Sequence, residues 1–453
     1  MAKAKTVYTC DACGGQTLQW AGQCPDCGGW NTLSMARAPA GPRSGASGNR
    51  VGYAGESPVE SLTDQVASAE TRISTGFDEL DRVLGGGLVP GAVVLIGGDP
   101  GIGKSTLLLQ AAARLSDRGV LYATGEESLR QVGLRARRLG VPDASMNLMT
   151  ETCVERIIAT AEKHKPAVLV VDSIQTIFSE NLQSTPGAVG QLRETTAQLT
   201  RMAKQSGIAV FIVGHVTKEG VIAGPRVLEH MVDTVLYFET DVGSRFRVIR
   251  AVKNRFGTVN ELGVFAMTED GLKQVKNPSA IFLSRHESPV SGSVITVTRE
   301  GSRPLMVEVQ ALVDESHLGN PRRVTVGLEQ NRLSMLLAVL HRHGGIAMSD
   351  QDVFVNVVGG LRLAETAADL PVLLAALSSF RDRCIPVDWV VFGEVGLAGE
   401  TRPVYNGEER MREAAKHGFK RAIVPHANAS KNLSIKGLDI LPAKRLVDVL
   451  DEI

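Results

Sequence analysis

One stretch, GGDPGIGKST at positions 97–106, constrains the fold of this chain more than any other. It follows the apolar run AVVLIG, which is typical of a buried strand, and precedes TLLLQAAARL, which is typical of a helix. A strand, a glycine-rich loop and a helix in this order turn backbone N–H groups inward around phosphate oxygens, at the positive end of the helix. The stretch therefore predicts a phosphate-binding loop (P-loop) within a parallel α/β sheet.

The same loop predicts a site for ATP and Mg²⁺. Lys104 is expected to reach the phosphates, for both binding and catalysis, and Ser105 to supply a hydroxyl to Mg²⁺. Thr106 is expected to lie near the α-phosphate. The predicted nucleotide-binding residues of the loop are Gly98, Asp99, Pro100, Gly101, Ile102, Gly103, Lys104, Ser105 and Thr106.

Acidic residues follow two other predicted strands. The run PAVLVVDS ends in Asp172, an acid placed to hold Mg²⁺ through water. The run LYATGEES ends in Glu126 and Glu127. Adjacent residues at a strand end point to opposite sides, so only one of them can face the phosphate. We favour Glu126 as the residue that orients the attacking water, with Glu127 as the alternative.

A further strand, FIVGHV, ends at His215. A polar residue at that strand tip can sense the γ-phosphate and pass its presence to the next loop, although a satisfied structural histidine is an equal alternative. The loop TKEGVIAGPRVLEHMVD that follows contains Lys218 and Arg226. It is too polar and too rich in glycine for a core segment, so it is predicted to lie along a phosphate backbone.

The segment KNRFG, Lys253 to Gly257, follows the alternating run RFRVIRAV. Lys253 and Arg255 are two positions apart on an extended segment and therefore share a face. They could reach the nucleotide of a neighbouring subunit, contact DNA, or form a solvated strand end, and the first two roles are compatible. Phe256 is expected to pack and Gly257 to permit a turn.

Four cysteines near the N-terminus fall into two C-x-x-C pairs. Cys10, Cys13, Cys24 and Cys27 predict a closed, tetrahedral structural zinc site, because two residues between thiolates let both face one ion. The segment is expected to unfold without the metal, since it has too few apolar residues for a core. We expect the nearby Trp20 and Trp30 to pack over the site, with stacking on nucleic-acid bases as the alternative.

Composition divides the chain into a zinc knuckle (1–34), a flexible linker (35–66), an ATPase domain (67–272) and a C-terminal α/β or α+β domain (273–453). The linker is rich in Gly, Ala, Ser and Pro and cannot bury enough surface to order itself. The formal net charge of zero means that any polyanion must bind a local patch. No apolar run approaches the roughly 18 residues of a membrane span, and no secretory signal begins the chain. A cytoplasmic location with no membrane partner is therefore expected.

The stretch STGFDELDRVLGGGLVPGAVVLIGGDPGIGKSTLLLQ resembles the ATPase core of the RecA superfamily. Together with the zinc knuckle, KNRFG and the C-terminal domain, it makes the chain similar over nearly its whole length to a bacterial DNA-repair group within that superfamily. The resemblance implies a homo-hexameric ring that translocates on single-stranded DNA, migrates branched DNA and works with a recombinase filament or a replicative helicase. It also implies that loops near residues 179–190 and 217–228 face the central channel. The candidate DNA contacts are Lys218, Arg226, Lys253 and Arg255.

Two stretches of the C-terminal domain, GGLRLAETAADLPVLLAAL and GEVGLAGETRPVYNGEERMREAAKHGFKRAIVP, resemble the segments of the Lon family's proteolytic domain that carry a catalytic serine and lysine. The resemblance places Ala367 at the serine position and Glu408 at the lysine position, so peptidase activity is expected to be absent. The domain is then expected to promote ring assembly and to offer a basic surface for duplex DNA. Candidate residues of that surface are Arg322, Arg323, Lys416, Lys420 and Arg421.

The leading functional prediction is a DNA-dependent ATPase motor of recombination and repair. An ATP-dependent protease is the first alternative, and the missing dyad argues against it. A signalling ATPase is the second, because TGFDELDRVLGGGL also resembles the KaiC family, which usually carries two ATPase copies where this chain has one. A nucleotide-gated assembly scaffold shares every motif and is the hardest to exclude.

Overall fold

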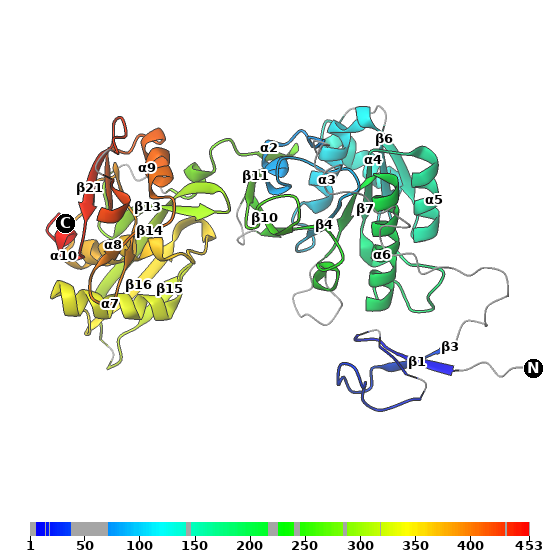
Figure 1. Cartoon of the computed structure of the whole chain (residues 1–453), viewed down its shortest axis with the longest axis horizontal. Helices are drawn as coiled ribbons and strands as arrows, with labels where there is room; N and C mark the ends of the chain where they lie inside the picture. Colours follow the sequence, from blue (N-terminus) through cyan, green and yellow to red (C-terminus); the bar gives the residue numbers. More distant parts are fainter. Residues whose placement is uncertain are drawn as a thin grey trace, which may run out of the picture. The chain divides into compact units, whose positions relative to one another are not determined.

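The computed structural model describes residues 6–13, 15–17, 19–37, 71–141, 146–215, 225–239, 245–283, 288–317, 319–430 and 433–452. The chain divides into two compact units, Met1–Val275 and Lys276–Ile453 (Figure 1). The domain boundary expected between residues 272 and 273 lies close to this division. Of the linker expected at residues 35–66, only 35–37 are among the described residues.

The N-terminal segment forms a small antiparallel sheet. Its strands are β1 (Thr6–Cys10), β2 (Gln16–Thr17) and β3 (Leu33–Arg37), in the order β2-β1-β3. The buried cluster of this segment consists of Cys10, Cys24 and Leu33, with Tyr8 and Cys13 packed against it. A core of this size cannot hold a fold by apolar burial, so the segment depends on its metal site.

A nine-stranded sheet forms the centre of the first unit, in the order β12-β11-β10-β9-β4-β8-β7-β5-β6. From β9 to β6 all neighbours are parallel, as the alternation of apolar runs and helices predicts. The remaining three strands extend the sheet in antiparallel fashion. The strands are β4 (Val93–Gly97), β5 (Val120–Thr124), β6 (Met146–Thr150), β7 (Val168–Asp172), β8 (Ala209–Val213), β9 (Thr234–Glu239), β10 (Phe246–Asn254), β11 (Leu262–Thr268) and β12 (Gly271–Gln274).

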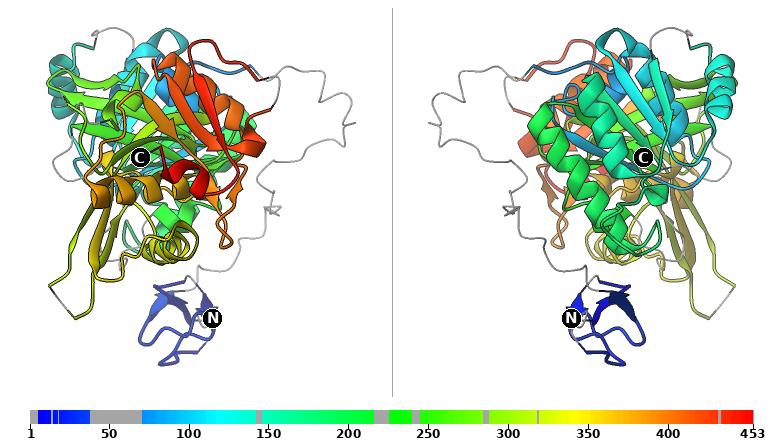
Figure 2. Two further views of the ribbon diagram at one scale, coloured as in Figure 1. Left: turned by 90° about the vertical axis from the view of Figure 1, so that its left-hand side faces the viewer. Right: turned by 90° about the vertical axis from the view of Figure 1, so that its right-hand side faces the viewer.

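Helices cover both faces of this sheet (Figure 2). One face packs against α2 (Asp78–Val83), α3 (Lys104–Arg114) and α4 (Leu129–Arg138). The other packs against α5 (Val154–His164) and α6 (Val189–Ser206). Short 3-10 turns are η1 (Ser116–Arg118), η2 (Ile174–Thr176) and η3 (Pro225–Leu228). The parallel strands end at one edge of the sheet, where open α/β sheets bind ligands. No helix among the described residues has the length and apolar character needed to cross a membrane.

The second unit is built on separate sheets. The stretch GSVITVTREGSRPLMVEVQALV forms the expected hairpin, β13 (Ser293–Glu300) and β14 (Arg303–Glu315). A four-stranded sheet continues through β16 (Gln351–Val357) to β15 (Arg323–Val326). The other strands are β17 (Trp389–Val391), β18 (Glu394–Val395), β19 (Thr401–Arg402), β20 (Arg421–Pro425) and β21 (Asp439–Ala443). The helices are η4 (Pro278–Ile281), α7 (Gln330–Gly344), η5 (Val358–Gly360), η6 (Thr366–Ala368), α8 (Asp369–Arg381), α9 (Gly407–Lys416), η7 (His426–Asn428) and α10 (Val447–Leu450).

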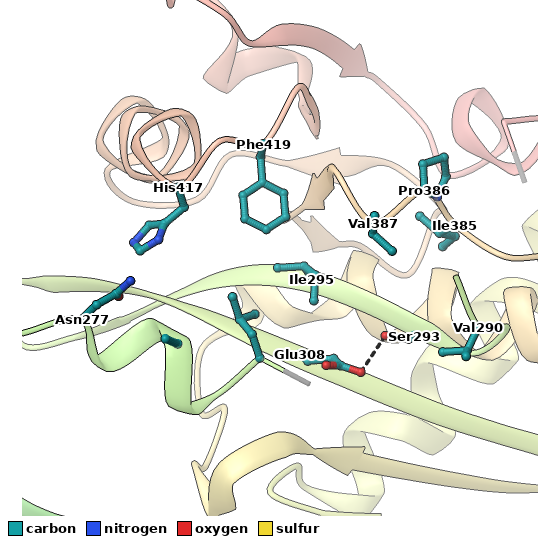
Figure 3. A pocket seen from close by; sticks show the side chains of 12 residues that line it. Asn277, Val290, Ser293, Ile295, Glu308, Ile385, Pro386, Val387, His417 and Phe419 are labelled. Atoms are coloured by element: carbon teal, nitrogen blue, oxygen red, sulfur yellow. Dashed lines mark hydrogen bonds between the residues drawn. The ribbon is translucent and has the colours of Figure 1, made fainter. Parts of the chain in front are cut away.

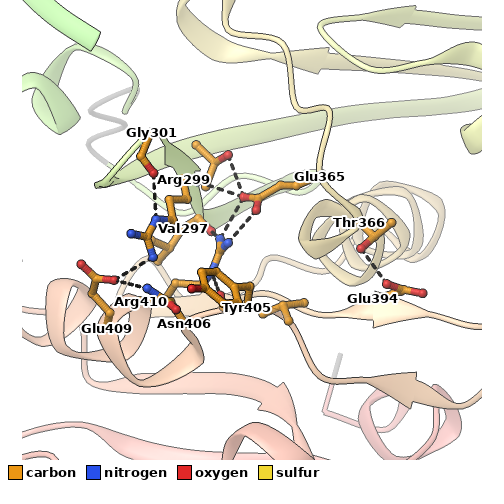
Figure 4. A network of polar contacts seen from close by, with 12 residues as sticks. Val297, Arg299, Gly301, Glu365, Thr366, Glu394, Tyr405, Asn406, Glu409 and Arg410 are labelled. Carbon is orange, nitrogen blue, oxygen red and sulfur yellow. Dashed lines mark hydrogen bonds and ion pairs between the residues drawn. The ribbon is translucent and has the colours of Figure 1, made fainter. Parts of the chain in front are cut away.

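An ion pair between a buried arginine and a partly exposed glutamate joins distant parts of this unit (Figure 4). Arg410 of α9 is 1% exposed and donates to both carboxylate oxygens of Glu365, over 2.9 and 2.6 Å. The same guanidinium donates to the backbone carbonyls of Val297 and Tyr405, and Glu365 accepts from the backbone N–H of Arg299. The network therefore connects β13, α9 and the segment before η6.

We predict that Glu365→Ala destabilises the second unit by about 3–5 kcal/mol, because it leaves the Arg410 guanidinium buried without its counter-charge. Calorimetry of the full chain should show the transition of this unit at a lower temperature. Glu408→Ala is the matched control, since Glu408 pairs with Arg412 on the surface of the same helix. Such exposed pairs contribute at most about 0.5 kcal/mol. Equal effects of the two substitutions would contradict the prediction.

Candidate nucleotide-binding site

The loop between β4 and α3 spans residues 98–103. Gly98 has a φ of +148°, and a Cβ at this position would lie 2.9 Å from the Cβ of Phe238. Gly103 has a φ of +118°, and its Cβ would lie 2.8 Å from the Cε of Met267. Both positions therefore require glycine. Lys104 begins the helix, so the loop lies at the positive end of α3.

Lys104 is folded back over this loop. Its ammonium donates to the carbonyls of Gly98 and Asp99, over 2.7 and 2.8 Å. Burial lowers the pKa of Lys104 to about 8, against the opposing effect of the carboxylates of Asp172, Asp99 and Glu126. The side chain thus stays mainly charged at neutral pH and lies among the predicted site residues.

Asp172 is the last residue of β7 and is buried. Its Oδ2 accepts a hydrogen bond of 2.5 Å from the hydroxyl of Tyr122 on β5. Ser105 is the second residue of α3 and carries the hydroxyl expected to bind Mg²⁺. Carboxylate and hydroxyl oxygens are the kind of donor that Mg²⁺ takes, so these side chains fit the ion.

The two adjacent acids after β5 have different partners. Glu126 accepts a hydrogen bond from Ser173, and its Oε1 lies 3.3 Å from Nε2 of His215. The contact with His215, followed by that with Ser173, lowers the pKa of Glu126 in spite of partial burial. Glu127 instead forms an ion pair with Arg135 of α4. Glu126 thus lies among the residues that follow β7 and β8, and Glu127 is directed to a helix.

His215 follows the tip of β8, two residues after Val213. Its backbone carbonyl accepts a hydrogen bond of 3.3 Å from Gln175, just after Asp172. Among the described residues, Nδ1 of His215 and Oε1 of Gln175 are buried without a hydrogen-bond partner. Lys218 lies outside the described residues, and so does the side chain of Arg226.

The cations of KNRFG lie against the segment that enters β9. Lys253 donates to the carbonyls of Glu229 and Val232, over 2.8 and 2.9 Å. Arg255 forms an ion pair of 3.2 Å with Asp233, which also binds Lys204 at 2.6 Å. The side chain of Arg255 is 58% exposed and that of Asp233 only 3%. Burial and the neighbouring Arg255 both lower the pKa of Lys253. The two cations therefore share one electrostatic environment.

Gly257 has a different role from the one expected. Its φ is not in the left-handed region, so a turn does not require glycine there. A Cβ on Gly257 would instead lie 2.7 Å from the Cα of Gly85, in the GGG turn that precedes β4. Arg72 secures this contact by donating to the carbonyl of Phe256 over 2.8 Å. The glycine is needed for close approach of two backbones.

KNRFG and the P-loop lie at opposite ends of β4. The backbone N–H of Val93, at the start of β4, donates to Asp233 over 3.0 Å, and Asp233 is the partner of Arg255. The P-loop begins just after Gly97, at the other end of the strand. Four steps along a strand span about 13 Å. Arg255 thus lies at the far end of this strand from the P-loop of its own chain.

The loop expected to face a channel, residues 179–190, is anchored at its start. Ser179 and Asn181 donate to the carboxylate of Glu155, and Gln191 donates to the carbonyls of Leu182 and Ser184. Burial would raise the pKa of Glu155, but the hydrogen bond from Ser179 and others lower it to about 2. Residues 183–186 are exposed beyond these anchors.

The four N-terminal cysteines converge on one point. Sγ of Cys10 lies 3.7 Å from that of Cys27, and Sγ of Cys13 lies 3.6 Å from that of Cys24. All four sulfurs lie within 4.8 Å of one another. Zn–S bonds of about 2.3 Å in a tetrahedron separate the sulfurs by about 3.8 Å, so this donor set fits zinc.

The expectation that Trp20 and Trp30 cover the metal site is wrong. They are 61% and 71% exposed, respectively. The ring of Trp30 instead faces Gly22, whose Cβ would lie 3.7 Å from it. The buried positions next to the cysteines are taken by Leu33 and in part by Tyr8. The two tryptophans are close to the ligands in sequence, but closeness in sequence does not determine which way a side chain points.

We predict that Cys27→Ser removes the zinc and unfolds residues 6–37, because apparent folding energies of about 10–16 kcal/mol come from the metal in such small domains. Metal analysis should detect the loss of zinc, and limited proteolysis should cut this segment faster than in wild type. Cys384→Ser, which alters an exposed cysteine of the second unit, should leave both unchanged. An intact segment without zinc would contradict the prediction.

The two positions at which the Lon resemblance places a dyad, Ala367 and Glu408, hold no serine or lysine. Ala367 is buried in η6, and Glu408 pairs with Arg412 on α9. Most candidate cations of the expected basic surface also have partners. Arg421 pairs with Asp439, Lys416 with Glu413, and Arg323 donates to the carbonyls of Gln351 and Met348.

A pocket of about 400 Å³ lies in the second unit (Figure 3). Its walls are mainly apolar and include Ile295, Ile385 and Phe419. The hydroxyl of Ser293 donates to Glu308 over 2.7 Å at this pocket. The lining contains none of the site residues predicted from the sequence.

Sequence reasoning missed three residues near the nucleotide site and KNRFG. Tyr122 bonds Asp172, Asp233 bonds Arg255, and Arg247 donates to the carbonyl of Ile102 in the P-loop over 3.1 Å. A tyrosine at the centre of a mostly aliphatic strand was the available signal for Tyr122. No signal existed for Arg247, because its position depends on how β10 pairs.

The fold and the site define a P-loop ATPase of RecA-like architecture, with a zinc ribbon before it and a Lon-like unit after it. Three family models agree with this description. They are an AAA domain over residues 57–221, a rubredoxin metal binding domain over 8–34, and subunit ChlI of Mg-chelatase over 318–428.

Relatives that match this chain over nearly its whole length show the family to which it belongs. DNA repair protein RadA of Pseudomonas aeruginosa is 61% identical over 453 residues, which cover 100% of this chain and 99% of the relative. The proteins of the same name from Escherichia coli and Bacillus subtilis are 56% and 48% identical, each over 99% of both chains. The chain belongs to the family of DNA repair protein RadA. The resemblance to a bacterial DNA-repair group is thereby confirmed.

Proposed function

We propose that this chain is a DNA-dependent ATPase of recombination and repair, which translocates on single-stranded DNA and drives branch migration. The name of its relatives supports the repair role, and the AAA match supports ATP hydrolysis. The observation that carries the proposed sharing of catalytic sites between subunits of this motor is the position of KNRFG, at the opposite end of β4 from the P-loop. Cations placed there cannot serve the nucleotide of their own subunit.

Within one subunit, the proposed roles follow from the geometry of the site. Lys104 and the loop N–H groups bind the phosphates, and Ser105 and Asp172 hold Mg²⁺. The ion, when bound, neutralises charge on the β- and γ-phosphates. Glu126, kept ionised by its contacts with His215 and Ser173, orients the attacking water and accepts its proton.

Between subunits, Arg255 and Lys253 act on the γ-phosphate held by a neighbour. Arg255 is more than half exposed, and its contact with Asp233 fixes only one end of the guanidinium. An interface in which one patch of each subunit meets a different patch of the next closes into a ring when the rotation allows. We propose a homo-hexamer, with the second unit as a scaffold without peptidase activity that promotes assembly.

DNA is proposed to contact the loops on the channel side of the ring. The exposed residues 183–186 extend from the anchors formed by Glu155 and Gln191. Lys218 and Arg226 belong to the second loop and supply cations for the phosphate backbone. His215 links that loop to Glu126 and thus to the nucleotide. Branched DNA, with a recombinase filament or a replicative helicase, is the proposed setting.

Steady-state ATP hydrolysis with and without single-stranded DNA tests this proposal. We expect strong stimulation by DNA, and DNA binding that weakens steeply as salt rises, because contacts to phosphates release counterions. Lys104→Ala is the control for contaminating ATPases. If DNA does not change the rate of ATP hydrolysis, the proposed motor function is wrong. A nucleotide-gated scaffold or a signalling ATPase of the KaiC type is then the favoured function.

A further inference from the structure

Tyr122 lies at the centre of β5, a strand of the central sheet that is buried throughout and that contains one other residue with a hydroxyl, Thr124 at its end. Tyr122 is 1% exposed, and it belongs to the apolar cluster between the sheet and α3. In the pairing of β5 with β7, Thr124 lies opposite Asp172 and Tyr122 opposite Val170. Tyr122 and Asp172 therefore project from the same face of the sheet, two residues apart along the strands. The phenol reaches Oδ2 of Asp172 over 2.5 Å.

Packing alone does not explain this hydroxyl. A phenylalanine would fill the same space among the aliphatic side chains, and burying a hydroxyl costs stability unless it is hydrogen-bonded. The hydroxyl does have a partner, and that partner is the acid at the end of β7. A hydrogen bond to one oxygen of a carboxylate restricts its rotation and leaves the other oxygen for a second contact.

We propose that Tyr122 is a positioning residue of the ATPase, which holds Asp172 in the orientation that supports Mg²⁺. This inference rests on the proposed role of Asp172 in holding the ion. In this proposal Tyr122, which is 1% exposed, has no contact of its own with the nucleotide. It acts through Asp172, so its loss should weaken the response to Mg²⁺ and leave metal-free nucleotide binding unchanged.

Binding of a fluorescent ADP analogue to the full chain, titrated with Mg²⁺, tests the inference. In Tyr122→Phe we expect the Mg²⁺ concentration that gives half of the metal-dependent change to rise roughly ten-fold, as loss of one hydrogen bond to a charged group implies. Affinity without Mg²⁺ should equal that of wild type. Val168→Ala is the matched control, because it removes packing on the same sheet face at the far end of β7. It should lower the melting temperature without shifting the Mg²⁺ response.

The double variant Tyr122→Phe/Asp172→Asn separates the possible outcomes. If Tyr122 acts through Asp172, the double variant has the Mg²⁺ response of Asp172→Asn alone. The inference is overturned if the two substitutions have additive effects on the Mg²⁺ concentration at half response. It is also overturned if Asp172→Asn changes that concentration and Tyr122→Phe does not. If the Mg²⁺ response of Asp172→Asn equals that of wild type, Asp172 does not hold the metal, and the inference about Tyr122 is wrong as well.

Discussion

The Glu126→Gln variant is expected to bind ATP as wild type does and to hydrolyse it about 10²–10⁴-fold more slowly, the usual contribution of a general base. Glutamine keeps the size of the side chain and can still accept a hydrogen bond from Ser173. It cannot take a proton from the attacking water. Phosphate release at saturating ATP and single-stranded DNA measures the rate, and a fluorescent nucleotide analogue measures binding.

Glu127→Gln is the control that the chain itself provides. Glu127 is the next residue, and its ion pair with Arg135 is partly exposed. Loss of such a pair costs at most about 1 kcal/mol and should leave the hydrolysis rate within roughly a few-fold of wild type. If Glu127→Gln is the inactive variant, the two acids have been assigned the wrong way round.

Arg255→Ala is expected to reduce DNA-stimulated hydrolysis by about 10³-fold or more, as loss of a cation supplied in trans to a γ-phosphate does. DNA binding should persist. Arg250→Ala is the matched control, because Arg250 lies on β10, the strand that leads into KNRFG, and pairs with Glu239. Its hydrolysis rate should remain near that of wild type.

A mixture of Arg255→Ala with Lys104→Ala tests whether the cation acts between subunits. Each variant alone should be inactive. In mixed rings, a Lys104→Ala subunit offers its intact Arg255 to the intact P-loop of an Arg255→Ala neighbour, so activity should return. If mixing restores nothing and Arg255→Ala no longer binds DNA, the segment is a DNA contact instead.

The centre of the parallel part of the fold could be predicted from sequence because β4, β5, β7 and β8 are buried along their whole length. Such strands appear as continuous apolar runs bounded by helices, and the run GAVVLIGG is an example. The antiparallel extension could not be predicted in the same way. RFRVIRAV alternates as an edge strand does, but alternation does not say which neighbour it pairs with or in which direction.

Site chemistry was predictable where spacing along the chain fixes geometry and not where side-chain partners decide it. The cysteine pairs and the P-loop are of the first kind. Glu126 and Glu127 are of the second, since both stand at one strand end and only Ser173, His215 and Arg135 distinguish them. Asp233, the partner of Arg255, is distant from KNRFG in sequence and comes beside it only through the pairing of β9 with β10.

The fully buried strand β4 has a consequence for how the protein responds to its own abundance. The P-loop follows one end of this strand, and Asp233, the partner of Arg255, lies at the other end. The strand therefore keeps Arg255 at a fixed distance from the nucleotide site of its own subunit. If Arg255 acts on a neighbour's nucleotide as proposed, an isolated subunit would not hydrolyse ATP at any ATP concentration. Specific activity should fall more steeply than in proportion on dilution, as rings dissociate and every catalytic centre loses its neighbour. The amount of protein in the cell would thereby act as a threshold for turnover.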